Sequence, residues 1–118
     1  MRIESKCMKH SAEKYLEDIR LSILDIETYV KDVKTAYEIE QNQLLFDALC
    51  RRFAIIGEAI YQAEKAGFSL ALSDKKKIMG LRHIIVHDYD VIRPAEIWMI
   101  IVNKVPVLKA EVQIALGL

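Results

Sequence analysis

Apolar residues recur at steps of three and four positions along most of this chain, and that spacing constrains its fold more than any other feature. One stripe consists of Leu16, Ile19, Ile23, Ile26, Val30 and Val33, and a second of Leu45, Leu49, Phe53, Ile56, Ile60 and Ala63. An α-helix brings residues at this spacing onto one face, so each stripe predicts an amphipathic helix with a buried side. No segment sustains the polar–apolar alternation of a strand. The chain is therefore predicted to be all-α.

Capping residues suggest the limits of the first two helices. The first helix is expected from about Ser11, a residue type that favours the N-cap, to Val30. The polar stretch 31–42 is expected to hold a break or a short extra turn. The second helix is predicted over about residues 41–66, ended by Gly67, which can adopt the left-handed conformation of a helix C-cap.

Two further helices complete the predicted bundle. A third is expected to open at residues 73–74 and to end near His87, followed by a short loop. A last, largely apolar helix begins at Pro94 and should be kinked at Pro106, since proline removes a backbone donor and clashes with the preceding turn. We expect an antiparallel up-and-down bundle of four to five helices with a kinked last helix, forming one domain over residues 1–118.

The amino-acid composition limits the partners and the cellular location expected for such a bundle. Seventeen basic and seventeen acidic residues cancel, so the chain has no general electrostatic attraction for nucleic acid. Apolar residues make up 53% of the sequence, which favours a chain that buries part of its surface against another copy.

No apolar run approaches the ~20 residues of a membrane span, and the charged N-terminus does not resemble a signal peptide. Cys7 and Cys50 have no metal-ligand spacing. We expect a cytoplasmic protein with free thiols, Cys50 in the core, and no metal or cofactor.

Two glycines fall inside predicted helices, Gly57 in the second and Gly80 in the third. Each costs about 1 kcal/mol relative to alanine, so a structural reason is expected. Close approach of two helices is such a reason. We predict that the two helices cross near this pair and bring Glu58 near Arg82.

The segment 80–89 holds the residues most suited to phosphate chemistry, namely Arg82, His87 and Tyr89. Arg82 and His87 would lie about 140° apart on a regular helix. They come together only if the helix opens or ends at His87. Tyr89 would follow in the loop.

The spacing of Arg82, His87 and Tyr89 resembles the Arg-x4-His-x-Tyr signature of the HEPN superfamily in its HepT-like branch. The segment 55–59, Ile-Ile-Gly-Glu-Ala, is similar to a characteristic segment of that branch, and the resemblance extends over roughly residues 14–116. It implies a metal-independent endoribonuclease toxin that works as a homodimer on RNA. It also implies a minimal nucleotidyltransferase antitoxin as partner, which adenylylates the motif tyrosine. Arg82 and His87 then match the catalytic pair and Tyr89 the modified residue.

Two positions depart from the pattern of that branch. His83 stands where asparagine is frequent, and Asp88 stands where glycine is frequent. A carboxylate at Asp88 would repel a scissile phosphate beside it. This favours the alternative function, a non-catalytic HEPN module that binds a nucleotide or docks a protein and partners a nucleotidyltransferase.

Further residues are assigned supporting roles. Glu58, His83 and Asp88 are expected to support the site, and the residues expected to bind RNA are Lys75, Lys76, Lys77 and Arg52. Three lysines in a first helical turn sit poorly against the helix dipole, which favours a phosphate-binding role over a merely solvated turn.

Each assigned residue also has a purely structural interpretation. His87 could cap the helix C-terminus, Arg82 could form a buried ion pair with Glu58, and Tyr89 could be an ordinary packing aromatic. If the site is catalytic, RNA cleavage without a metal needs a base, an acid and positive charge at the phosphate. One histidine cannot be both base and acid at one instant. A twofold dimer would supply two copies of His87, with Arg82 holding the phosphate oxygens bidentately.

Overall fold

The computed structural model describes the backbone of residues 2–118 and the side chains of residues 12–118. Within this part of the chain every regular element is a helix, so the predicted all-α class is confirmed. The elements, in chain order, are α1 (Arg2–Tyr29), α2 (Ala36–Glu40), α3 (Gln43–Lys65), α4 (Lys75–His87), the 3₁₀ turn η1 (Tyr89–Val91), α5 (Pro94–Asn103) and α6 (Val105–Ala115).

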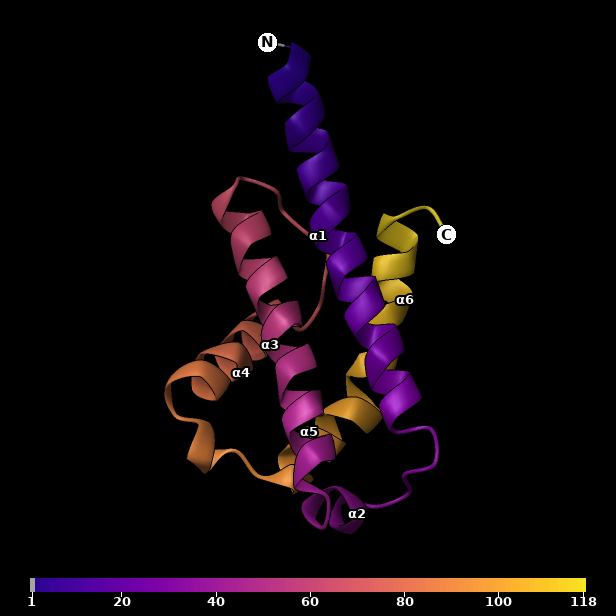
Figure 1. Ribbon diagram of the computed structural model, residues 1–118. Coiled ribbons are helices and arrows are strands. Elements are labelled where there is room, and N and C mark those ends of the chain that lie inside the picture. Colours follow the sequence, from indigo (N-terminus) through magenta and orange to yellow (C-terminus); the bar gives the residue numbers. More distant parts are fainter. Residues whose placement is uncertain (1) are drawn as a thin grey trace.

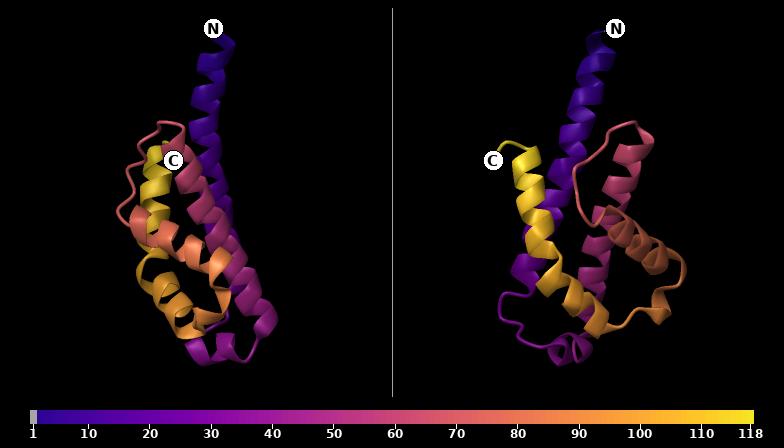
Figure 2. Two further views of the ribbon diagram at one scale, coloured as in Figure 1. Left: turned by 90° about the vertical axis from the view of Figure 1, so that its left-hand side faces the viewer. Right: turned by 180° about the vertical axis from the view of Figure 1, so that it is seen from behind.

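The helices pack as a bundle around α1 and α3, which run antiparallel side by side (Figure 1). The helix α6 lies along α1 on the side away from α4, and α4 crosses α3 obliquely (Figure 2). The short α2 lies at the end of the bundle against α3 and α5. Because α3 is the helix that α4 contacts most extensively, the residues of α4 are placed mainly by this one helix.

The core is built from the predicted apolar stripes. In α1 and α3 the stripe residues that are buried are Leu16, Ile19, Ile23, Ile26, Leu49, Phe53, Ile56, Ile60 and Ala63. In α4 the buried residues are Ile78 and Leu81, with Ile85 partly buried beside them. Full burial of such a side chain contributes about 1.5–3 kcal/mol to stability, so this shared face determines which side of each helix turns outward.

Local signals account for most of the helix ends. Asn42 caps α3, its side chain accepting a hydrogen bond from the backbone N–H of Leu45 at 3.1 Å. Gly67 ends α3 with a φ of 94°, the left-handed conformation expected of it. The polar stretch after α1 does hold a short extra turn, α2, capped by Thr35 and Glu38.

Two boundaries differ from expectation. α1 begins at Arg2, so the prediction that Ser11 starts this helix is wrong. No glycine or proline precedes Ser11, and serine costs little inside a helix, so nothing stops the helix from extending. The last helix is divided rather than only kinked. α5 ends at Asn103, and Pro106 lies in the first turn of α6, where its missing N–H would be unpaired in any case. This division and α2 bring the number of α-helices within residues 2–118 to six.

Cys50 is a buried free thiol, as predicted, whereas the side chain of Cys7 lies outside the described residues. Burial raises the pKa of the Cys50 thiol to about 11, with a further contribution from the charge of Asp47. Over the helices that the structure describes, none combines the length and the apolar character needed to cross a membrane.

Candidate functional site

The site begins where α3 and α4 cross at Gly57. A Cβ atom at Gly57 would lie 2.4 Å from the Cβ of Arg82 and 3.0 Å from the carbonyl oxygen of Ile78. Only a residue without a side chain permits this approach, so the crossing predicted at Gly57 is confirmed. The same prediction for Gly80 is wrong, because Gly80 is exposed and nothing lies within 4 Å of a Cβ built on it.

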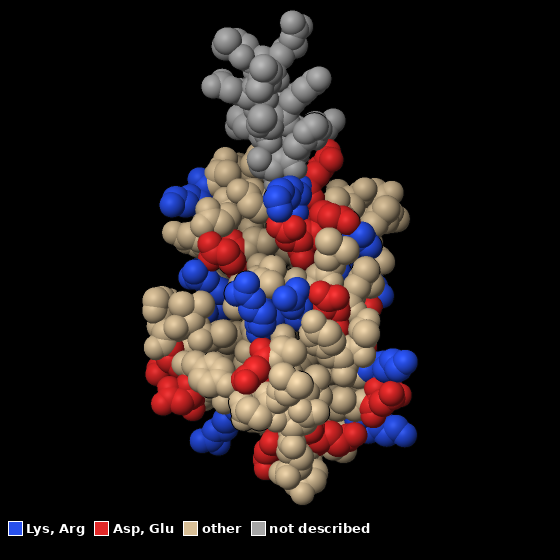
Figure 3. All heavy atoms as spheres, viewed as in Figure 1, with Lys and Arg blue, Asp and Glu red and all other residues tan. Residues whose placement is uncertain are grey.

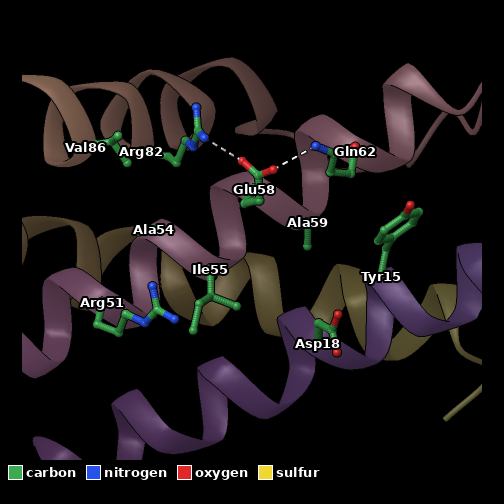
Figure 4. A pocket seen from close by; sticks show the side chains of 10 residues that line it. All are labelled: Tyr15, Asp18, Arg51, Ala54, Ile55, Glu58, Ala59, Gln62, Arg82 and Val86. Atoms are coloured by element: carbon green, nitrogen blue, oxygen red, sulfur yellow. Dashed lines mark hydrogen bonds and ion pairs between the residues drawn. The ribbon is translucent and has the colours of Figure 1, made fainter.

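The close crossing joins Arg82 of α4 to Glu58 of α3, as predicted. The Nη2 atom of Arg82 lies 2.7 Å from Oε1 of Glu58, although the contact is not aligned as a hydrogen bond. Gln62 donates a hydrogen bond from Nε2 to the other oxygen of Glu58, also at 2.7 Å (Figure 4). The Arg82 side chain remains 29% exposed. Glu58 therefore orients the guanidinium without enclosing it, and other N–H groups of Arg82 stay available to an anion.

Two hollows lie along the seam between α3 and α4. The first has a volume of about 320 Å³ and is lined by residues that include Glu58, Arg82 and Arg51 (Figure 4). The second, of about 490 Å³, shares Arg51 and Val86 with the first and reaches Tyr89. Both are open to solvent. Together they form a groove that leads from the Arg82–Glu58 pair to the motif tyrosine.

Tyr89 closes the far end of this groove. It begins the turn η1, and its hydroxyl donates a hydrogen bond of 2.5 Å to Oδ1 of Asp47. Gln43 donates from Nε2 to the same hydroxyl oxygen at 3.1 Å. The ring packs against Phe46 with centroids 6.2 Å apart, and the residue is 42% exposed. The hydrogen bond to the Asp47 carboxylate raises the pKa of Tyr89, because the phenolate would lose this bond and face a negative charge.

The two histidines of α4 lie ring to ring. The centroids of His83 and His87 are 4.6 Å apart, with the ring planes at 51°, and both residues are exposed. α4 stays helical up to His87 and then ends, with Asp88 as its exposed C-cap residue. The helix does not open, so Arg82 and His87 point from different faces of its last turns. His83 and Val86 lie between them around the helix.

The basic residues assigned to RNA binding lie elsewhere. Lys75 pairs with Glu64 at 2.5 Å, and Arg52 pairs with Asp25 at 3.1 Å. Lys76 and Lys77 are exposed at the opposite end of α4 from His87, about 15–16 Å away at 1.5 Å per residue. The structure does not bring this group to the motif. On the face shown in Figure 3, basic and acidic side chains are interspersed, and basic atoms gather near its middle, over α3.

Three residues of the site were not singled out by sequence analysis. Asp47 and Gln43 hold the Tyr89 hydroxyl, and Arg51 lines both hollows. A signal was available, since Asp47, Arg51 and Glu58 lie four and seven positions apart and so share one helical face. Among residues 12–118, no three His, Cys, Asp or Glu side chains converge in a group that could hold a metal ion.

Comparison with known proteins finds one family and relatives that cover most of this chain. The family described as "Ribonuclease HepT-like" matches residues 19–115. A Methanocaldococcus jannaschii protein named "Putative RNase MJ1380" is 32% identical over 107 residues, covering 90% of this chain and 97% of that protein. A second protein of the same organism, "Gamma-glutamylcyclotransferase and putative RNase MJ0434", is 31% identical over 111 residues, covering 89% of this chain and 47% of its own length. No solved structure matches the chain.

Proposed function

Because this chain belongs to the HepT-like ribonuclease family of the HEPN superfamily, we propose that it is a metal-independent endoribonuclease with Arg82 and His87 as its catalytic pair. The observation that carries the proposal is the environment of these two residues. Arg82 is held by Glu58 at the edge of an open groove, and His87 is exposed at the end of the same helix. A cation and a proton-transfer group are thus both accessible to solvent on the last turns of α4, although they point from different faces of the helix.

The chemistry assigned to each residue follows from its side chain. The guanidinium of Arg82 would bind the non-bridging phosphate oxygens, since its planar N–H donors match these oxygens in geometry. The hydrogen bonds would strengthen as negative charge develops on the oxygens in the transition state. The imidazole of His87 would transfer a proton, because it changes charge near neutral pH. The exposed Lys76 and Lys77 would contact the RNA backbone further along the strand. Lys75 and Arg52 could do so only by leaving their ion pairs.

The same proposal includes regulation by a partner. We place this protein as the toxin of a toxin–antitoxin pair whose antitoxin is a minimal nucleotidyltransferase that adenylylates Tyr89. The hydroxyl of Tyr89 lies at the surface and is already hydrogen bonded to a carboxylate, Asp47, that could accept its proton. These two facts support Tyr89 as the acceptor of the nucleotidyl group.

The proposed unit is a homodimer whose interface includes the segment Arg82–Tyr89. Apolar side chains on and just after this segment are exposed, namely Ile84 at 39%, Val86 at 52%, Tyr89 at 42% and Val91 at 53%. A second copy that covered them would remove this surface from water.

A non-catalytic module is the second candidate, and two observations favour it. Glu58 already neutralises Arg82, and Asp88 places another carboxylate directly after His87. Such a site could bind a nucleotide or dock a protein without cleaving RNA.

Incubating the purified protein with RNA in EDTA distinguishes the two candidates. The ribonuclease cleaves under these conditions, and Arg82→Ala abolishes the cleavage. An intact RNA after incubation with the parent protein excludes the ribonuclease proposal and leaves the binding module.

A further inference from the structure

His83 and His87 form a close pair on the outer face of α4. Their ring centroids are 4.6 Å apart, and both side chains are exposed at the end of the helix that carries Arg82. The two residues are four positions apart on one helix, so their side chains are neighbours within a single chain. Two groups able to transfer protons are therefore adjacent without any contribution from a second protomer.

RNA cleavage without a metal needs two proton transfers at one phosphate. The 2′-hydroxyl loses its proton to a base as its oxygen forms a bond to phosphorus. The bond from phosphorus to the 5′-oxygen breaks, its electron pair leaves on that oxygen, and an acid supplies the proton. The products are a 2′,3′-cyclic phosphate and a 5′-hydroxyl, and no oxidant or further reactant is consumed. One neutral and one protonated imidazole perform both transfers, and the exchanged protons return through water.

We propose that His83 and His87 of a single chain are the base and acid of this cleavage, with His83 a catalytic residue rather than a supporting one. The inference rests on the ribonuclease function proposed above and adds the second proton-transfer group to it. The geometry suits the task. Hydrogen bonds of about 2.8 Å from each ring let two imidazoles at this separation reach two oxygens on the same phosphorus. Arg82 directly precedes His83 in the same helical turn, about 100° around the helix, with its guanidinium paired to Glu58.

The matched variants His83→Gln and His87→Gln test the assignment. Glutamine keeps a hydrogen-bonding side chain of similar reach but cannot transfer a proton. Each variant should slow cleavage of an RNA oligonucleotide in EDTA by about 10²–10⁴-fold, the usual value of general acid–base catalysis. Asp90→Asn, an exposed change in η1, serves as the control and should cleave as the parent does. Unchanged melting temperatures would show that the losses are not losses of folding.

A sulfur substrate then identifies which histidine is the acid. The oligonucleotide is remade with sulfur in place of the 5′-bridging oxygen at the cleaved linkage. A thiol has a pKa of about 8.5, whereas the pKa of water is about 15.7, so a sulfur leaving group departs without a donated proton. Cleavage of this substrate should be restored in the variant that lacks the acid and should stay slow in the variant that lacks the base.

Mixing the two variants decides whether the pair works within one chain. If base and acid come from the same chain, a mixture of His83→Gln and His87→Gln stays inactive, because no chain holds both groups. Activity restored by mixing overturns the inference, and so does a His83→Gln variant that cleaves as fast as the parent. In both cases the ribonuclease function stands. A parent protein that leaves RNA intact in EDTA overturns the function and this inference with it.

Discussion

The hydroxyl of Tyr89 donates a hydrogen bond of 2.5 Å to Asp47, a residue 42 positions earlier in the chain. This bond ties the turn after α4 to the first turns of α3, and Gln43 adds a second bond to the same oxygen. It places the proposed modification site beside a carboxylate and at the end of the groove that contains Arg82. The raised pKa of the tyrosine therefore comes from a neighbour that the motif does not include.

Asp47→Asn should lower the pKa of Tyr89 toward the ordinary value for tyrosine. The parent carboxylate raises it, and an amide leaves no negative charge to oppose the phenolate. A raised pKa in the folded state stabilises the protein at pH values below that of an unfolded tyrosine, about 10, and this contribution is lost as the pH rises through the folded value. Ultraviolet absorbance of tyrosinate against pH, with Tyr89→Phe subtracted, measures the shift. An unchanged or higher pKa would contradict this account.

Tyr89→Phe should separate cleavage from modification. The ring keeps its packing on Phe46, whereas the bonds to Asp47 and Gln43 are lost at a cost of about 0.5–1.5 kcal/mol. RNA cleavage should largely survive, and transfer of a radiolabelled nucleotide to the protein should disappear. In cells the variant should stay toxic when the antitoxin enzyme is supplied. Tyr37→Phe, an exposed tyrosine on α2, is the control. Labelling that persists in Tyr89→Phe would assign the modification to another residue.

Gly57→Ala and Gly80→Ala should change stability in opposite directions. A methyl group at Gly57 meets the Cβ of Arg82 at 2.4 Å, which pushes α4 away from α3 and should cost about 1–3 kcal/mol. At Gly80 nothing lies within 4 Å, so alanine should gain up to about 1 kcal/mol from helix propensity. Thermal unfolding of both variants measures the difference. Because Arg82 is the residue displaced, Gly57→Ala should also slow RNA cleavage, and equal melting temperatures for the two variants would contradict the close crossing.

His87→Ala should reduce the cleavage rate by about 10²–10⁴-fold while leaving the melting temperature nearly unchanged, since the residue is exposed.

Arg82→Ala should also abolish cleavage but should lower stability, because it leaves the Glu58 carboxylate without its cation. Arg82→Lys keeps the charge and loses the bidentate geometry, so an intermediate rate is expected. Single-turnover cleavage and thermal unfolding separate these effects. A His87→Ala variant as fast as the parent would falsify the catalytic role.

Val86→Asp should convert the proposed dimer into a monomer. Val86 is 52% exposed in the motif segment, and a carboxylate there would be buried without a partner in the interface. Val107→Asp, on a 45% exposed valine of α6, is the matched control and should remain dimeric. Light scattering at micromolar concentration gives the mass of each variant. A monomeric parent, or a dimeric Val86→Asp, would count against an interface at this segment.

Much of the fold could be predicted because its signals are local. The stripes from Leu16 and from Leu45 mark the buried faces of α1 and α3, and Gly67 and Pro94 mark helix ends through their own backbone preferences. The start of α1 was not predictable in this way. Ser11 favours a cap but does not require one, and the residues before it also tolerate a helix.

The site was predicted less completely. The pairing of Glu58 with Arg82 followed from a glycine in each helix, although only Gly57 lies at the crossing. The spacing of four positions also indicates that His83 and His87 are neighbours on one helix face. This signal is visible only when the two histidines are considered together.

By itself, the sequence determined the helices, their buried faces and the presence of Arg82, His87 and Tyr89 near one helix end, since each depends on residues within a few turns. The tertiary structure alone decided that Asp47 binds Tyr89 and that Gly57, not Gly80, meets Arg82. Both contacts depend on the rotation and offset of α4 against α3. Those are set by how the two buried faces interlock, and the local sequence pattern of neither helix contains that information.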